Sequence, residues 1–136
     1  MALRVLASII LVTCVATSSP AQTAPPVPDN PFFKEWTTPF GVPPFSEIRP
    51  EHFLPAFKEA AARQRRAVDA IAGNAEPPTF ANTVEALEHS APLLDKVGPV
   101  FSNLSSAETN DALQAINREV APMLSALRDD IRLTPV

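Results

Sequence analysis

The chain contains few of the residues on which small functional sites are commonly built. Of its 136 residues one is cysteine, two are histidine, three are glycine and none is tyrosine. Three glycines cannot make the glycine-rich loop that cradles a phosphate. The single cysteine, Cys14, excludes a disulfide within the chain. The two histidines, His52 and His89, are too far apart in sequence to bind one metal ion from successive turns of a helix.

Neither positive nor negative charge dominates the chain. The 11 lysines and arginines against 15 aspartates and glutamates give a formal net charge of −4, which argues against nucleic acid as a partner. The basic cluster consists of Arg63, Arg65 and Arg66. Glu59 and Asp69 lie about one helical turn away on either side. This pattern is typical of a solvated helix face, and the alternative is a phosphate-binding site.

Residues 1–21 predict an export signal peptide. A positively charged start is followed by the apolar run Val5–Ala16, which would rise only about 18 Å as a helix and is too short to cross a bilayer. Small residues in Ser19-Pro20-Ala21 predict cleavage after Ala21 and a periplasmic product without cysteine. The alternative is a lipoprotein acylated at Cys14. We prefer the signal peptide, because the residue before Cys14 suits a lipoprotein cleavage poorly.

Residues 22–49 form a proline-rich segment that we expect to run extended. Residues 22–29 are a charge-poor tether, and four prolines follow in residues 30–49. The same stretch holds five large aromatic residues, whereas disordered linkers hold few. We therefore expect the rings to insert into a folded body, with Trp36 as a packing anchor rather than a ligand-stacking residue. The five aromatic residues are Phe32, Phe33, Trp36, Phe40 and Phe45.

Residues 50–136 show the periodicity of three amphipathic helices, which predicts an all-α fold. The first helix should begin near Pro50 and end at Gly73-Asn74. We expect Thr79 to cap the second helix and Thr109 to cap the third. The expected buried faces are Phe53, Phe57, Ala61, Gln64, Val68 and Ile71; then Phe80, Val84, Leu87, Ala91, Leu94 and Phe101; then Leu113, Ile116, Val120, Leu124, Leu127 and Ile131.

Prolines interrupt the second and third helical patterns. Pro92 and Gly98-Pro99 fall within the second, and a proline inside a helix removes a backbone donor and crowds the preceding turn. The second helix either ends at Gly98 or continues, kinked, to about Leu104; we expect the kinked helix. Pro122 should bend the third helix.

We identify no catalytic, cofactor-binding or metal-binding residue in this chain. His52 lies in the first turn of the first helix beside its apolar stripe and is interpreted as a partly buried structural residue. His89 lies beside Glu85 and Glu88 on the polar face of the second helix, and the same interpretation applies. The serines have no base within sequence reach.

Three ordered stretches resemble a known family: Asn30–Phe57, Pro77–Glu88 and Asn103–Pro122. They are similar to the N-terminal region of the thimet-oligopeptidase family of zinc metallopeptidases, within it to the dipeptidyl carboxypeptidase (peptidyl-dipeptidase) and oligopeptidase A branch. The resemblance implies a piece of a larger helical peptidase, forming part of the wall of a deep channel that admits short peptides. It also implies that zinc is bound by an HExxH segment in the missing C-terminal portion of the polypeptide. This chain alone should bind no zinc and be inactive.

Two functional hypotheses remain open. The chain is either the N-terminal helical part of an exported zinc-dependent oligopeptidase or peptidyl-dipeptidase, or an exported, non-catalytic helical module that binds a partner or has a structural role. Thr134-Pro135 is typical of a helix start, which favours a chain truncated after Val136. Neither hypothesis includes nucleic acid or, once the signal is removed, a membrane.

Overall fold

The computed structural model describes residues 29–133, so the predicted signal peptide, Cys14, most of the tether and Thr134-Pro135 lie outside the described residues. Within that range the chain is helical and contains no strand, which confirms the predicted all-α fold. The N-terminal segment contains two short 3₁₀ turns, and three helical stretches follow. The elements are η1 (Pro31–Phe33), η2 (Pro39–Gly41), α1 (Pro50–Ala72), the π-helix η3 (Phe80–Glu85), α2 (Ala86–Glu88), α3 (Pro92–Ala107) and α4 (Asp111–Leu133).

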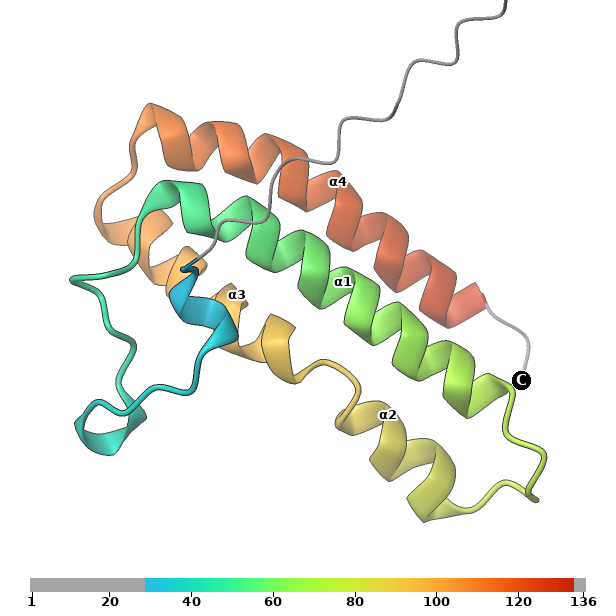
Figure 1. The fold of residues 1–136 in the computed structure, drawn as a ribbon. Coiled ribbons are helices and arrows are strands. Elements are labelled where there is room, and N and C mark those ends of the chain that lie inside the picture. The colour runs from blue at the N-terminus through green and yellow to red at the C-terminus, as the bar shows by residue number, and fades with distance from the viewer. Residues whose placement is uncertain (1–28, 134–136) are drawn as a thin grey trace, which may run out of the picture.

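Helix α1 is the centre of the arrangement. It packs against α4 on one side and α3 on the other, and it also contacts η1 and α2. Figure 1 shows α1 and α4 running in the same direction, with α3 on the other side of α1 and running the opposite way. The helix therefore has to be apolar on two sides, and its buried residues include Ala56 and Ala60 as well as the predicted Phe53, Phe57 and Val68.

The first helix begins and ends where the sequence predicts. Pro50 occupies its first position, and the backbone N–H of Arg49 donates to Nδ1 of His52 at 3.1 Å. A side chain three residues into the helix thus satisfies a donor at the helix start. At the other end the Gly73 N–H donates to the Asp69 carbonyl at 2.9 Å, and the helix stops at Ala72.

The second helical stretch corrects the prediction of one kinked helix. Thr79 caps it as expected, since its hydroxyl accepts from the Asn82 N–H at 3.2 Å. The helix then stops after Glu88, and α3 starts afresh with Pro92 at its first position, where the missing donor costs nothing. Gly98-Pro99, the alternative stop, lies inside α3, which continues to Ala107.

The break changes which residues are buried. Leu93, Val97, Val100 and Phe101 enter the core from α3. Of the predicted stripe before the break, Phe80, Val84 and Leu87 are 74%, 46% and 44% exposed, so their predicted burial is wrong in this structure. The prediction assumed one continuous helix, but the break between α2 and α3 changes which side chains on either side of it face the core.

The last helix matches its predicted face but not its predicted cap. Asn110, rather than Thr109, caps α4, because its side-chain oxygen accepts from the Leu113 N–H at 2.9 Å. Leu113, Val120 and Leu127 are buried, and α4 continues through the predicted bend position to Leu133. Ile116, Leu124 and Ile131 are half-buried on the same face.

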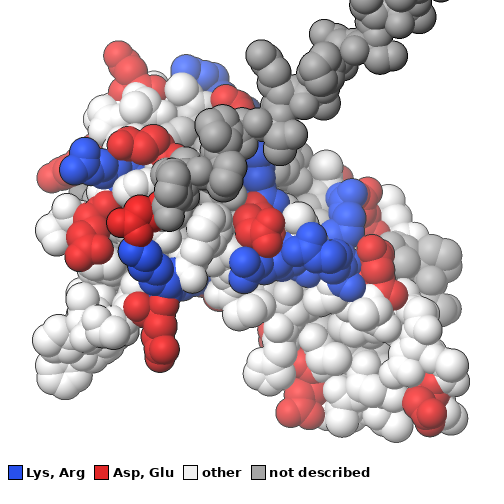
Figure 2. Space-filling view, viewed as in Figure 1, with Lys and Arg blue, Asp and Glu red and all other residues white. Residues whose placement is uncertain are grey.

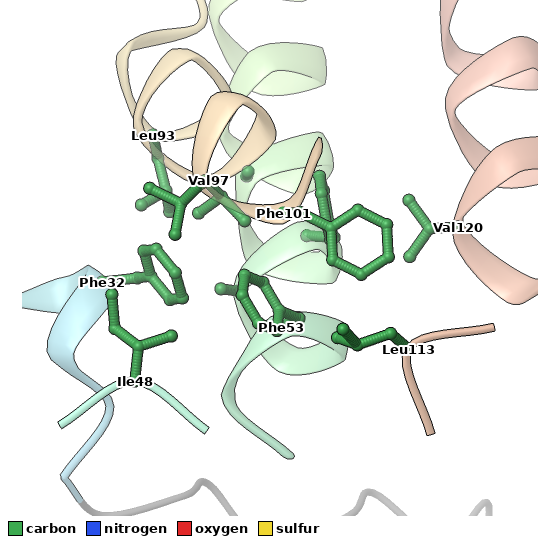
Figure 3. Packing of buried hydrophobic residues seen from close by; sticks show 12 residues of the cluster. Phe32, Ile48, Phe53, Leu93, Val97, Phe101, Leu113 and Val120 are labelled. Carbon is green, nitrogen blue, oxygen red and sulfur yellow. The ribbon is translucent and has the colours of Figure 1, made fainter. Parts of the chain in front are cut away.

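The aromatic rings of the core gather at the end where α1 begins. The Phe53 ring lies 5.2 Å from Phe32 and 5.1 Å from Phe101, measured between centroids, and Phe57 meets Phe101 edge-on at 5.4 Å. Figure 3 shows the rings of Phe32, Phe53 and Phe101 together, with Leu113 and Val120 of α4 alongside. Such aromatic pairs add to the stabilisation from burial.

Candidate functional site

The N-terminal segment is fixed to the helices by an anchor that we define as Asn30, Phe32 and Trp36. Asn30 is 2% exposed; its side-chain oxygen accepts from the Phe32 N–H at 3.0 Å and its amide donates to the His52 carbonyl at 2.8 Å. These bonds turn the Phe32 ring into the core, where it is 1% exposed. The insertion predicted for five rings occurs for Phe32 and, partly, for Trp36.

The other three aromatic residues of the segment point outward. Phe33, Phe40 and Phe45 are 44%, 103% and 46% exposed, so their predicted insertion is wrong in this structure. Phe40 has φ 59° and ψ 16°, a left-handed conformation that costs a bulky residue free energy. In the view of Figure 2 the projecting loop around η2 forms an uncharged lobe.

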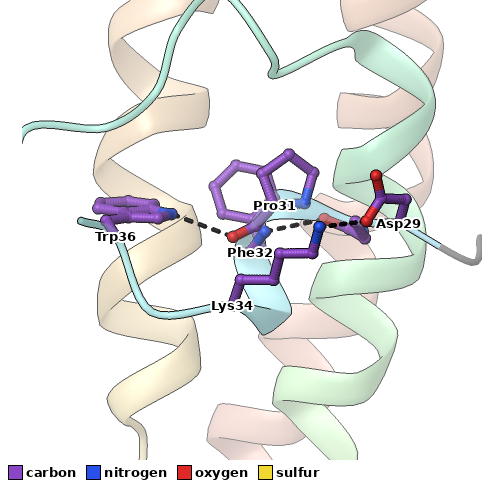
Figure 4. Close-up of polar contacts among 6 residues, drawn as sticks. Asp29, Pro31, Phe32, Lys34 and Trp36 are labelled. Carbon is purple, nitrogen blue, oxygen red and sulfur yellow. Dashed lines mark hydrogen bonds and ion pairs between the residues drawn. The ribbon is translucent and has the colours of Figure 1, made fainter. Parts of the chain in front are cut away.

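Trp36 is a packing anchor, as predicted. Its indole N–H donates to the Pro31 carbonyl at 3.0 Å, and its ring lies 6.2 Å from that of Phe32 (Figure 4). Its other neighbour, which no sequence pattern indicated, is Lys96 of α3, whose Nζ lies 4.3 Å from the ring centroid. This cation–π contact joins the N-terminal segment to α3. Burial lowers the pKa of Lys96.

The two histidines lie on separate elements and do different things. His52 is 9% exposed and accepts from the Arg49 backbone through Nδ1, while its carbonyl accepts from Asn30. The predicted partial burial of His52 is observed. His89 is exposed, and its backbone N–H donates to the Glu85 carbonyl at 3.1 Å where the helix ends.

A metal site does not fit the residues that the structure describes. Between residues 29 and 133 no group of three or more histidine, cysteine, aspartate or glutamate side chains is placed to hold a metal ion. No step of zinc chemistry is therefore assigned to these helices. In the same range, no helix combines the length and the apolar content needed to cross a bilayer.

The basic cluster is a solvated, ion-paired helix face, as predicted. Glu59 accepts from Arg63 at 2.8 Å and from Arg66 at 3.4 Å, and Arg65 pairs with Asp130 of α4. The hydrogen bond from Arg63 is the main cause that lowers the pKa of Glu59. Figure 2 shows the basic side chains of this face interleaved with acidic ones. Such exposed pairs contribute little stability each.

A hollow of about 350 Å³ lies among α1, α2, α3 and α4. We call it the α2–α4 groove. Its apolar lining comes from Leu87, Leu94, Leu124, Leu127 and Ile131, and its polar lining from Gln64, Arg128 and Arg132. Sequence reasoning missed the groove because it assigned these apolar residues to faces that cover one another. Pro92, which interrupts the helical pattern, was the sequence signal that these faces would not cover one another.

Comparison with known proteins relates the chain to bacterial peptidases. It is 40% identical over 104 residues to dipeptidyl carboxypeptidase of Escherichia coli and 38% identical over 104 residues to that of Salmonella typhimurium. It is also 32% identical over 88 residues to oligopeptidase A of Salmonella typhimurium. The matches cover 76%, 76% and 65% of this chain.

These matches confirm the resemblance drawn from the sequence: the chain is related to the dipeptidyl carboxypeptidase and oligopeptidase A branch of peptidases. The chain spans only about 15% of the length of the dipeptidyl carboxypeptidases and 13% of that of oligopeptidase A. No family model matches it.

Proposed function

We propose that this chain is the N-terminal helical part of an exported zinc-dependent oligopeptidase or peptidyl-dipeptidase that cleaves short peptides. The observation that carries the proposal is the 40% identity over 104 residues to a dipeptidyl carboxypeptidase. The matched part is helical and holds no metal-binding group among the described residues. In this proposal the catalytic HExxH segment and its zinc belong to another part of the same polypeptide.

The helices of this chain would act as part of the scaffold around the peptide channel. The anchor and the aromatic cluster hold the N-terminal segment against α1 and α3, which gives this part a rigid end. The α2–α4 groove leaves another part open to further structure. A scaffold that continues into a larger body is expected to have both.

We propose a periplasmic location for the mature protein. The support is the export pattern of residues 1–21, with cleavage after Ala21 and with acylation at Cys14 as the alternative. N-terminal sequencing of the exported protein should start at Gln22. A lipid-modified start at Cys14 would contradict the location in solution.

The rival function is a non-catalytic binding module, and the exposed side chains of Phe80, Val84 and Leu87 favour it. Peptidase assays distinguish the two. We expect residues 22–136 alone to release no product from an N-blocked oligopeptide. The polypeptide translated from the same gene through an HExxH segment should cleave it, and a chelator should abolish the cleavage. Chelator-sensitive cleavage by residues 22–136 alone, or a gene without an HExxH segment, would contradict the proposal.

A further inference from the structure

The second helical stretch exposes a stripe that has the spacing of a buried face. Phe80, Val84 and Leu87 are four and three residues apart, so they share one side of the continuous helical stretch η3–α2. They are 74%, 46% and 44% exposed. Three large apolar residues in register on one helix form a face that normally packs against a neighbouring element.

The stripe and the α2–α4 groove are continuous, since Leu87 belongs to both. From Leu87 the apolar lining passes over Leu94 of α3 to Leu124 and Ile131 of α4. The hollow is bounded by four helices, since Gln64 of α1 lines it as well.

The end of α4 determines what can reach this surface. Ile131 and Arg132 line the groove, and Leu133, the last described residue, is 79% exposed. A chain that continues from Leu133 starts at the edge of the hollow. Helices in compact domains are commonly joined by about two to eight residues. The next helix of the same polypeptide can thus enter the groove through a short connection, and Thr134-Pro135 has the pattern of a helix start.

The chemistry of the lining selects an amphipathic helix. The floor is leucine and isoleucine, and the rim carries the guanidinium groups of Arg128 and Arg132 beside Gln64. A helix with an apolar stripe and acidic residues at its edges would place the stripe on the floor and its carboxylates at the rim.

We propose that the α2–α4 groove and the stripe Phe80, Val84 and Leu87 are covered by the polypeptide that follows α4 in the same protein. The proposal rests on the proposed function, because it needs a chain longer than the one described. The relatives support that length, since this chain spans 15% of the dipeptidyl carboxypeptidases that it matches. Relative to those proteins, most of the polypeptide is available to cover the groove.

Cysteine labelling tests the proposal, because residues 22–136 contain no cysteine. The probes are Leu87→Cys in the groove and Phe80→Cys on the stripe, and the matched control is Arg118→Cys on the exposed side of α4. Each variant is made in residues 22–136 and in the longer polypeptide translated from the same gene, with cysteines beyond codon 136 changed to serine. The measurement is the rate of alkylation by a water-soluble maleimide.

We expect both probes to react at least about tenfold more slowly in the longer polypeptide, since a covered thiol reacts only when the structure opens. The Arg118→Cys control should react at similar rates in both. Unchanged probe rates in a longer polypeptide would contradict this proposal alone. A reading frame that ends at codon 136 would contradict the proposed function and this proposal together. Slow labelling of residues 22–136 that speeds up on dilution would assign the surface to a second copy instead.

Discussion

The two halves of α1 follow one amphipathic pattern but have different surroundings. In the first half, Phe53 and Phe57 are 1% and 2% exposed, enclosed by η1, α3 and α4. In the second half, Gln64 borders the α2–α4 groove and Val68 borders a second hollow of about 220 Å³ between α1 and α4. The difference shows that the spacing of apolar residues identifies the helix face that will be buried. Elements distant in the sequence determine what covers that face.

We call the end of the molecule around Phe53 the closed end, and the end around the α2–α4 groove the open end. The largest expected effect comes from removing an aromatic ring at the closed end. Phe53→Ala should lower the free energy of unfolding of residues 22–136 by about 3–5 kcal/mol, because it leaves a cavity between Phe32 and Phe101. Phe80→Ala, the same change at the open end, should stay within about 0.5 kcal/mol. Urea unfolding followed by circular dichroism measures both. Equal losses would remove the distinction between the two ends.

A smaller effect is expected at the anchor of the N-terminal segment. Asn30→Ala removes the acceptor of the Phe32 N–H and the donor to the His52 carbonyl, both at a buried position. We expect a loss of about 1–3 kcal/mol, because the abandoned backbone groups stay poorly solvated. Asn103→Ala, an exposed change on α3, is the control. If Asn30→Ala unfolds at the same urea concentration as this control, the anchor does not hold the closed end.

The smallest effect is expected at the ion-paired face of α1. Glu59→Gln should cost about 0.2–1 kcal/mol, since the pairs with Arg63 and Arg66 are exposed to solvent. The two arginines lower the pKa of Glu59 from its ordinary 4.5, so its contribution is present above that value and is lost as the pH falls through the lowered one.

Unfolding measured from neutral pH downward tests this sign. The difference between the native chain and Glu59→Gln should shrink as the pH falls below the ordinary range of the carboxyl group, and it should be smaller in high salt. Glu119→Gln, on the exposed side of α4, serves as the control. A difference that grows on acidification would contradict the ion-pair account.

Residues that act on the backbone within a few positions predicted several helix ends correctly. Pro50, Thr79 and Gly73 mark helix ends through backbone geometry and capping that act within a few residues. The relation to the peptidase branch was also readable from the sequence. Pro92 was ambiguous, because a proline either kinks a helix or starts one, and the packing of α3 on α1 decides between them.

The contacts that sequence reasoning missed join distant parts of the chain. Asn30 reaches His52, and Lys96 reaches Trp36, without any periodicity that links the two segments. The α2–α4 groove is lined by residues of four helices, and a stripe of apolar residues in the sequence does not show which element will cover it. The sequence therefore predicts that the lining of the α2–α4 groove is apolar, but not that the groove is left uncovered by these helices.

Native-state hydrogen exchange on residues 22–136 tests the central claim, that the chain is closed at one end and open at the other. We predict that amides of residues 57–60 exchange at least about a hundredfold more slowly than those of residues 84–88, because opening the open end disturbs few buried contacts. Similar protection in both segments would contradict the account. It would show a chain that closes its own structure and needs no further polypeptide.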